Sequence, residues 1–228
     1  MSILGGIIKK ILVLFFGTTI LAVVLYRYVP VYITPLMLIR IAEQKSDNKK
    51  VEFHHDWVPL KDISPDMVRA VVASEDNLFF SHHGFDVEQI QKAIEEAKQG
   101  RRHRGASTIS QQTAKNVFLW NGGGYFRKAL EAYFTIMIEW LWGKERIMEV
   151  YLNSIEMGNG IYGAESVAQK HFGKKASKLT RDECALIAVS LPNPLKRNSA
   201  HPTAYMLKRK GQILTIMNNL GPLPSLNK

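Results

Sequence analysis

The sequence predicts a mainly α-helical protein with one N-terminal transmembrane helix, and two observations lead to this fold class. Apolar residues recur at helical spacing through most of the chain after residue 60, whereas alternation typical of strands is scarce and is best at 51–53. An apolar run, Ile11–Tyr26, precedes this part and is flanked by Lys9, Lys10 and Arg27. Because such a run approaches the roughly 20 residues that cross a bilayer, we expect an anchor followed by one folded domain.

The expected division between anchor and domain falls between residues 43 and 44. Residues 1–43 would form the anchor and an interfacial segment, because a second apolar stretch at 28–39 is interrupted by Pro30 and Pro35. Residues 44–228 would form the domain, whose polar and aromatic composition begins near Val51. A cleaved signal peptide is the alternative, but no clear small-x-small cleavage site follows the apolar run.

Helix signals then follow in order along the domain. Ser64 and Pro65 predict a helix start, with serine as the N-cap and proline at the first helical position, and this helix ends near Glu75. Further helices are expected at 87–97, 107–119, 126–141, 143–151, 164–170, 181–191 and 205–220. Three glycines at 122–124 separate two of them. A basic loop at 99–105 contains Arg101, Arg102 and Arg104.

Charge and cysteine content limit the classes of function. A net charge of +10 requires an anionic partner, which nucleic acid, lipid headgroups and phosphorylated substrates could each provide. The single cysteine, Cys184, excludes an intrachain disulfide and is best interpreted as a small buried apolar residue. The sequence contains no HExxH or Cys/His framework, no P-loop and no GxGxxG pattern, so structural zinc is not expected.

A first candidate segment for chemistry is SEDNLFFSHHG at 74–84. It places two adjacent carboxylates, Glu75 and Asp76, at a predicted helix end beside Phe79, Phe80 and His82. A carboxylate beside aromatic groups has its pKa raised and can act as an acid or a base. The alternative is a solvated acidic helix end, which the apolar residues on both sides disfavour.

A second candidate segment is GASTISQQTAKN at 105–116. On a helix, Thr108, Gln111, Gln112 and Lys115 would share one face by their spacing. Ser107 and Thr108 lie near the predicted N-terminus, where free backbone N–H groups favour anions. Hydroxyl, amide and ammonium groups on one face fit a ligand rich in phosphate or sugar, and a polar face toward solvent is the alternative.

A third candidate segment is RKALE at 127–131, where Arg127 and Glu131 are four residues apart and share a helix face. An exposed ion pair of this kind contributes only a few tenths of a kcal/mol. Because the rest of this helix is rich in Phe, Met, Ile and Trp, the pair could instead face a cleft.

These three segments, in this order, resemble the glycosyltransferase family 51 domain, the polymerase half of bifunctional penicillin-binding proteins. With one anchor and no second domain, the chain is most similar to the monofunctional biosynthetic peptidoglycan transglycosylases of that family. The resemblance continues through 144–153, 161–174 and 183–194 and covers roughly 51–198. The sequence departs from the family pattern at Ala106, at His171 and at Val189–Ser190, none of which is an expected reacting group.

The resemblance implies a lysozyme-like, mostly helical fold of two lobes, with the lower lobe partly embedded in the bilayer at 28–39 and 118–120. The implied substrate is lipid II, the undecaprenyl-pyrophosphate disaccharide-pentapeptide. The family joins the 4-hydroxyl of one unit to the anomeric carbon of a growing chain. The α-linked pyrophosphate is thereby replaced by a β-1,4 bond, with inversion at the anomeric carbon. The glycan strands made in this way serve cell wall synthesis and cell shape.

The resemblance also implies a role for each motif residue. Glu75 would be the general base, and Glu131 the second carboxylate near the leaving group or its divalent cation, Mg²⁺ or Mn²⁺. No organic cofactor is expected. Lys115 and Arg127 would stabilise the pyrophosphate. The expected substrate-binding residues are Asp76, Phe79, His82, Ser107, Thr108, Gln111, Gln112, Lys115, Asn116 and Arg127.

The expected partners are lipid II, the growing glycan chain and the inner membrane, with the domain on the periplasmic side of a single span. Transpeptidases and cell-division proteins are expected as protein partners, and nucleic acid is not. One rival interpretation is a lytic hydrolase of the same polymer, which would not need cations such as Lys115 and Arg127. The other rival is a membrane-tethered module that binds nucleic acid, but the sequence has no nucleic-acid motif and its arginines cluster in one short loop.

Overall fold

The computed structural model describes residues 3–48, 50–100, 105 and 107–224, and within them the chain is mostly helical. This confirms the predicted fold class. The three arginines of the predicted basic loop, Arg101, Arg102 and Arg104, lie outside the described residues. The described helices are α1 (Ile3–Tyr28), α2 (Pro35–Ser46), α3 (Pro65–Glu75), α4 (Val87–Lys98), α5 (Ile109–Phe118), α6 (Gly124–Leu141), α7 (Gly143–Ser154), α8 (Ala164–Phe172), α9 (Arg181–Ser190) and α10 (Ala204–Asn219).

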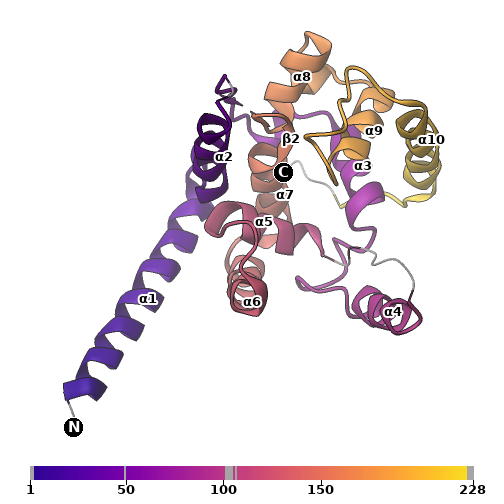
Figure 1. The fold of residues 1–228 in the computed structure, drawn as a ribbon. Coiled ribbons are helices and arrows are strands. Elements are labelled where there is room, and N and C mark those ends of the chain that lie inside the picture. Colours follow the sequence, from indigo (N-terminus) through magenta and orange to yellow (C-terminus); the bar gives the residue numbers. More distant parts are fainter. Residues whose placement is uncertain (1–2, 49, 101–104, 106, 225–228) are drawn as a thin grey trace.

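The N-terminal helix α1 projects away from the rest of the molecule (Figure 1). Its segment Gly5–Tyr28, with a mean hydropathy of 2.2, is long and apolar enough to cross a membrane, and it extends beyond the predicted core of Ile11–Tyr26. Helix α2 follows where an irregular interfacial stretch was expected, and the Thr34 hydroxyl caps it by accepting the Met37 N–H at 3.2 Å. The predicted boundary between residues 43 and 44 falls inside α2.

A small sheet lies beside the helices and has the strand order β1-β3-β2. Strand β1 (His54–His55) pairs in parallel with β3 (Ile161–Tyr162), and β2 (Glu156–Gly158) pairs antiparallel with β3. The predicted strand at 51–53 is wrong, because pairing begins only at His54, whose N–H donates to the Gly160 carbonyl at 2.8 Å. Strands this short carry too few residues for alternation to reveal them.

The helices of the domain pack in two groups. Helices α3, α9 and α10 contact one another, and α5, α6 and α7 form a second set that also contacts α1 and α2. Figure 1 shows the first group on the side away from α1. This arrangement agrees with the two lobes that the resemblance implies, whereas the likeness to lysozyme stays a prediction. Buried apolar residues of both groups belong to one continuous core.

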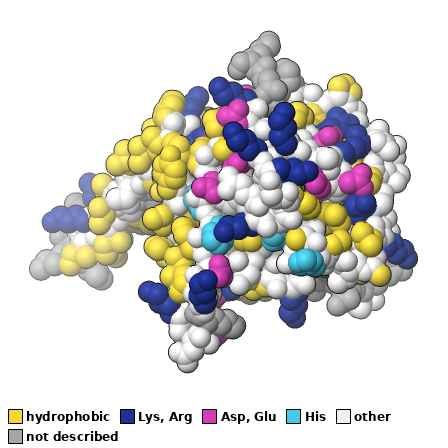
Figure 2. Space-filling model, turned by 90° about the horizontal axis from the view of Figure 1, so that it is seen from above, with side chains coloured by type: hydrophobic (Ala, Val, Ile, Leu, Met, Phe, Trp, Pro, Cys, Tyr) yellow, Lys and Arg dark blue, Asp and Glu magenta, His cyan; other side chains and the backbone are white. Residues whose placement is uncertain are grey.

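Apolar side chains outside this core gather on one side of the molecule. In the view of Figure 2, hydrophobic groups concentrate where α1 and α2 lie, whereas Lys and Arg are spread over the rest. Within the stretch 118–120, which the resemblance implies to be embedded in the bilayer, Trp120 is 37% exposed, whereas Leu119 is 1% exposed and Phe118 stacks on Phe134 at 4.5 Å. Helix α6 carries further exposed apolar groups, namely Tyr125, Phe126, Ile136 and Trp140.

Candidate active site

The first and second sequence motifs are joined by the carboxylate of Asp76. This residue ends α3, is buried, and accepts the backbone N–H of Ile109 at 3.0 Å, at the start of α5. The Asp76 oxygens also accept from His82 Nε2, each at 3.0 Å. Because a helix start leaves backbone N–H groups without partners, a fixed carboxylate there sets the position of α5 relative to α3.

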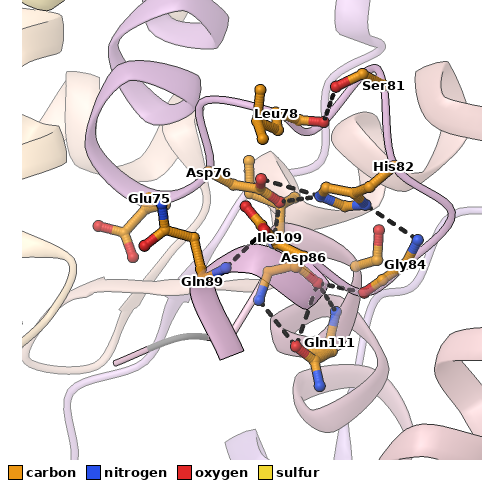
Figure 3. A network of polar contacts seen from close by, with 12 residues as sticks. Glu75, Asp76, Leu78, Ser81, His82, Gly84, Asp86, Gln89, Ile109 and Gln111 are labelled. Atoms are coloured by element: carbon orange, nitrogen blue, oxygen red, sulfur yellow. Dashed lines mark hydrogen bonds and ion pairs between the residues drawn. The ribbon is translucent and has the colours of Figure 1, made fainter. Parts of the chain in front are cut away.

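His82 in turn fixes the loop that leads to α4. Its Nδ1 accepts the Gly84 N–H at 3.1 Å, so its proton is on Nε2, facing Asp76. Gly84 has φ +93°, and a Cβ there would lie 2.8 Å from Thr135 Cγ2, so both the turn and the close approach to α6 require glycine. Figure 3 shows this network, with Glu75 pointing away from it.

Thr108 and Gln111 form a capping box at the start of α5. The Thr108 hydroxyl accepts the Gln111 N–H at 3.2 Å, and the Gln111 side-chain oxygen accepts the Thr108 N–H at 3.0 Å. Thr108 also donates to the Gly84 carbonyl at 2.6 Å. Both residues are buried, so the predicted face shared with Gln112 and Lys115 is wrong: Thr108 lies before the helix, and Gln111 points into the protein.

Five of the expected substrate-binding residues therefore make contacts that hold this part of the protein together, and Gln112 and Arg127 have protein partners as well. Phe79 is fully buried, packs edge-on against Phe80 and lies under the Lys144 ammonium at 4.6 Å from its ring centre. These contacts explain the residues as supports of the site. Direct substrate binding by them stays a prediction. The five are Asp76, Phe79, His82, Thr108 and Gln111.

Glu75, at the end of α3, accepts one hydrogen bond on each carboxylate oxygen. Ser74 Oγ donates to Oε1 and Gln112 Nε2 donates to Oε2, both at 3.1 Å. Burial raises the pKa of Glu75 above its ordinary value, while these two donors and the charges of Arg209 and Arg197 oppose the rise. The direction of the pKa shift is the predicted one, and a half-buried carboxyl with a raised pKa is suited to accept a proton.

The two donors to Glu75 each line a different cavity. Gln112 lines a cavity of about 260 Å³ between α2, α5 and the segment 191–195, which we call the α5 cavity. Ser74 lines a cavity of about 640 Å³ against α10, which we call the α10 cavity. Its cationic side chains are Arg197, Lys208 and Arg209. Glu75 itself lines neither cavity, but through these two donors it lies next to both.

The α5 cavity also contains Lys115 and Asn116, next to a group of charges around Glu131. Glu131 is 3% exposed, and its two oxygens pair with Arg127 at 2.6 Å and with Lys128. Desolvation lowers the pKa of the Lys115 ammonium, Glu131 raises it, and the charges of Arg127 and Lys128 lower it further. Three cations thus surround one buried carboxylate, which gives this end of the site an excess of positive charge.

The residues around Glu131 do not fit a metal held by the protein. Both carboxylate oxygens accept from cationic side chains, and a divalent cation would have to displace them. Nor does any group of three His, Cys, Asp or Glu side chains among the described residues form a set of metal ligands. We therefore do not assign Glu131 as a metal ligand.

The structure brings Gln112, Lys115 and Asn116 together in the lining of the α5 cavity, and Glu75 is hydrogen-bonded to Gln112. Ser107 is exposed at the N-terminal side of α5. Sequence reasoning missed three residues that border Glu75. Tyr151 on α7 donates to Gln112, and Arg197 and Arg209 bring positive charge from the segments around α10. Only tertiary packing reveals them, because they lie far from residue 75 in the sequence.

The chain is thus a helical domain with a half-buried carboxylate next to two polar cavities, preceded by an apolar helix. It belongs to the transglycosylase family, whose profile matches residues 42–218. Among curated proteins, a biosynthetic peptidoglycan transglycosylase of Bacteroides thetaiotaomicron is 54% identical over 220 residues, covering 96% of this chain and 89% of the relative. A protein of the same name from Caulobacter vibrioides is 53% identical, covering 85% of this chain and 82% of the relative. Another from Pseudomonas syringae is 46% identical, covering 96% and 93%.

Proposed function

We propose that the protein is a peptidoglycan transglycosylase that polymerises a lipid-linked disaccharide-pentapeptide into β-1,4 glycan strands. The family and the names of the relatives support the class of reaction. The structural observation that supports it most is that the two side chains donating to Glu75 line two different cavities, both of which contain cations. Because donor and acceptor each carry a pyrophosphate, a polymerase needs positive charge on both sides of its base, whereas a hydrolase does not.

In this reaction Glu75 would take the proton of the acceptor 4-hydroxyl while that oxygen forms its bond to the anomeric carbon of the growing chain. The bond between that carbon and the undecaprenyl pyrophosphate breaks on the opposite face, so the configuration is inverted. A sugar hydroxyl is a weak nucleophile, and a base with a raised pKa takes its proton more readily than an exposed carboxylate does. The proton stays on Glu75 until solvent or the departing pyrophosphate removes it.

We place the leaving pyrophosphate near Lys115 and Arg127, where negative charge grows as the bond breaks. Glu131 would hold Arg127 and Lys128 in position rather than touch the sugar. The acceptor's own pyrophosphate would take the side of Arg197 and Arg209. The expected divalent cation, Mg²⁺ or Mn²⁺, would find its ligands among pyrophosphate oxygens, which Mg²⁺ commonly uses.

We further propose that α1 anchors the protein in the inner membrane with the domain on the periplasmic side, where lipid II and the growing chain are found. Transpeptidases and cell-division proteins that act on the same side are the proposed protein partners. Photocrosslinking from exposed positions of α8, such as Lys170, in intact cells tests this, and recovery of cytoplasmic proteins alone would contradict it.

The experiment that tests the function offers two substrates to the full-length protein in detergent. Fluorescent lipid II should become a ladder of glycan strands, and finished, uncrosslinked glycan should keep its length. Glu75→Gln supplies the inactive control. Shortening of finished glycan without polymer from lipid II would replace the polymerase by a hydrolase.

A further inference from the structure

The buried hydroxyl of Tyr151 approaches the base through a single intermediate side chain. Tyr151 lies on α7 and is fully buried, and its hydroxyl is 3.2 Å from Gln112 Oε1. Gln112 Nε2 lies 3.1 Å from Glu75 Oε2. Helices α5 and α7 pack directly against each other, so the three side chains connect the core of the domain to the boundary of the two cavities.

The direction of these hydrogen bonds follows from chemistry. The Glu75 carboxylate only accepts, so the amide NH₂ of Gln112 must face it, and the amide oxygen must then face Tyr151. Because that oxygen also only accepts, the phenol donates its proton. Burial and the negative charges of Glu75 and Asp76 raise the pKa of Tyr151 well above its ordinary value, so the phenol keeps this proton at working pH.

We propose that Tyr151 is a positioning residue for the base, because its hydroxyl fixes the orientation of the Gln112 amide that donates to Glu75. Without the phenol, the amide oxygen loses its hydrogen-bond partner and only the NH₂ group remains held, by Glu75 at 3.1 Å and by the Ser107 carbonyl at 3.5 Å. The side chain then leaves Glu75 more often. The proposal rests on the proposed role of Glu75. It assigns no contact with substrate to Tyr151, which is fully buried.

The consequence for Glu75 has a definite sign. A donor to a carboxylate favours its charged form, so the amide of Gln112 opposes the rise in pKa that burial causes. If the amide turns away, the pKa of Glu75 rises further. The base is then active only at higher pH, and the acid limb of the pH–rate profile moves upward.

The test is a mutant cycle on the full-length protein, with lipid II polymerisation measured from acid to neutral pH. Tyr151→Phe should lower the rate at fixed acidic pH by about threefold to tenfold, the scale of one lost hydrogen bond, and shift the acid limb upward. Gln112→Ala should shift it in the same direction. The double variant should behave as Gln112→Ala alone, because Tyr151 acts only through Gln112. Tyr133→Phe, whose hydroxyl bonds Thr19 of α1 at 2.9 Å, is the matched control and should leave the limb in place.

Several results would overturn the proposal. An unmoved acid limb in Tyr151→Phe would do so, as would effects that multiply in the double variant, which is the result expected of a purely structural tyrosine. If Tyr151→Phe does not fold, as measured by thermal unfolding, an unmoved limb in Gln112→Ala alone decides against it. Glu75→Gln distinguishes failure of this inference from failure of the proposed function. If Glu75→Gln is inactive and the acid limb of Tyr151→Phe does not move, only the role of Tyr151 is rejected. If Glu75→Gln is fully active, the proposed function is rejected.

Discussion

At the scale of residues, the two carboxylates of the site have opposite surroundings. Glu75 accepts from two neutral donors, Ser74 and Gln112, and burial raises its pKa. Glu131 is paired with two cations, Arg127 and Lys128. Surroundings that differ in this way support the different roles that we propose for the two carboxylates.

The first prediction concerns Glu75→Gln, which keeps the shape of the side chain but cannot take a proton. We expect polymerisation to fall by about 10²-fold or more, the usual scale for a lost general base. Binding of a donor-site inhibitor should persist, since the cations proposed for the donor pyrophosphate, Lys115 and Arg127, are unchanged. The exposed Glu145→Gln on α7 is the matched control. A Glu75→Gln enzyme with near-normal polymerisation would reject Glu75 as the base.

The second prediction concerns Glu131→Gln, a substitution that we expect to change the rate through the charge of Lys115. Glu131 raises the pKa of Lys115, so its removal lets desolvation and the two neighbouring cations lower that pKa further. Lys115 then loses its charge at a lower pH. The rate should fall, and the basic limb of the pH–rate profile should move downward while the acid limb set by Glu75 stays in place.

A titration with Mg²⁺ in the same variant tests the role of Glu131 with respect to metal. Because Arg127 and Lys128 occupy the carboxylate oxygens of Glu131, the Mg²⁺ concentration that gives half the maximal rate should be the same in Glu131→Gln as in the unaltered protein. A large increase in that concentration would make Glu131 a metal ligand. If the basic limb of the pH–rate profile does not move, the pKa of Lys115 does not depend on Glu131, which contradicts the second prediction.

The sequence revealed the site residues that lie within its motifs. It also predicted substrate binding for residues that instead support the local structure, because both roles use the same residue types. Thr108 and Gln111 match a capping box as well as a polar binding face, and the structure shows the capping box. Spacing could have revealed it, since glutamine three residues after threonine is the usual signature. Tyr151 gave no such signal, because a tyrosine in an apolar run predicts only burial.

At the scale of elements, an arginine joins the N-terminal helix α1 to the domain. Arg146 on α7 donates to the Tyr26 carbonyl at 2.8 Å and 3.1 Å and to the Val29 carbonyl at 2.5 Å, at the C-terminal end of α1. Trp142 Nε1 adds a bond to the Val23 carbonyl at 2.7 Å. The last carbonyls of a helix have no partners within it, so these donors fix the direction in which α1 leaves the domain.

The third prediction concerns Arg146→Ala, which should loosen the end of α1 and cost about 2 kcal/mol of unfolding free energy, the scale of charged hydrogen bonds. Hydrogen exchange should rise at residues 24–31. Arg69→Ala is the matched control, because Arg69 donates in the same way to the Met217 and Leu220 carbonyls at the end of α10. Faster exchange near residue 220 in Arg146→Ala, with no change at 24–31, would contradict the assignment.

The long helices were predictable from the sequence, whereas α2 and the sheet were not. Apolar spacing revealed α6, α7 and α9 within a few residues of their ends. Helix α2 begins at Thr34–Pro35, the same kind of signal that located α3 at Ser64–Pro65, but the apolar composition before it favoured an interfacial reading. The pairing of β1 with β3 depends on contacts between residues about a hundred positions apart, which local patterns do not encode. Strands β2 and β3 pair locally but are too short for alternation to reveal them.

At the scale of the whole molecule, apolar surface and anchor lie together. Only 6% of the apolar window of α1 is buried, and α6, which packs against α1, exposes Tyr125, Phe126, Ile136 and Trp140. A helix of 24 residues spans roughly 36 Å, which exceeds a hydrocarbon core of about 30 Å. These surfaces would let a membrane hold the domain close to a lipid-linked substrate while both cavities stay in water.

The last prediction concerns the side of the membrane on which the domain lies. Lys9 and Lys10 precede the apolar run, but Arg27, Arg40 and Lys45 follow it, so the positive-inside rule decides little and the orientation needs a direct measurement. Protease added to intact spheroplasts should digest the domain and leave a short fragment that contains α1. A cytoplasmic marker protein must survive in the same sample, and detergent must expose both proteins to the protease. Protection of the whole chain until detergent is added would place the domain in the cytoplasm, where it could not extend glycan strands outside the membrane.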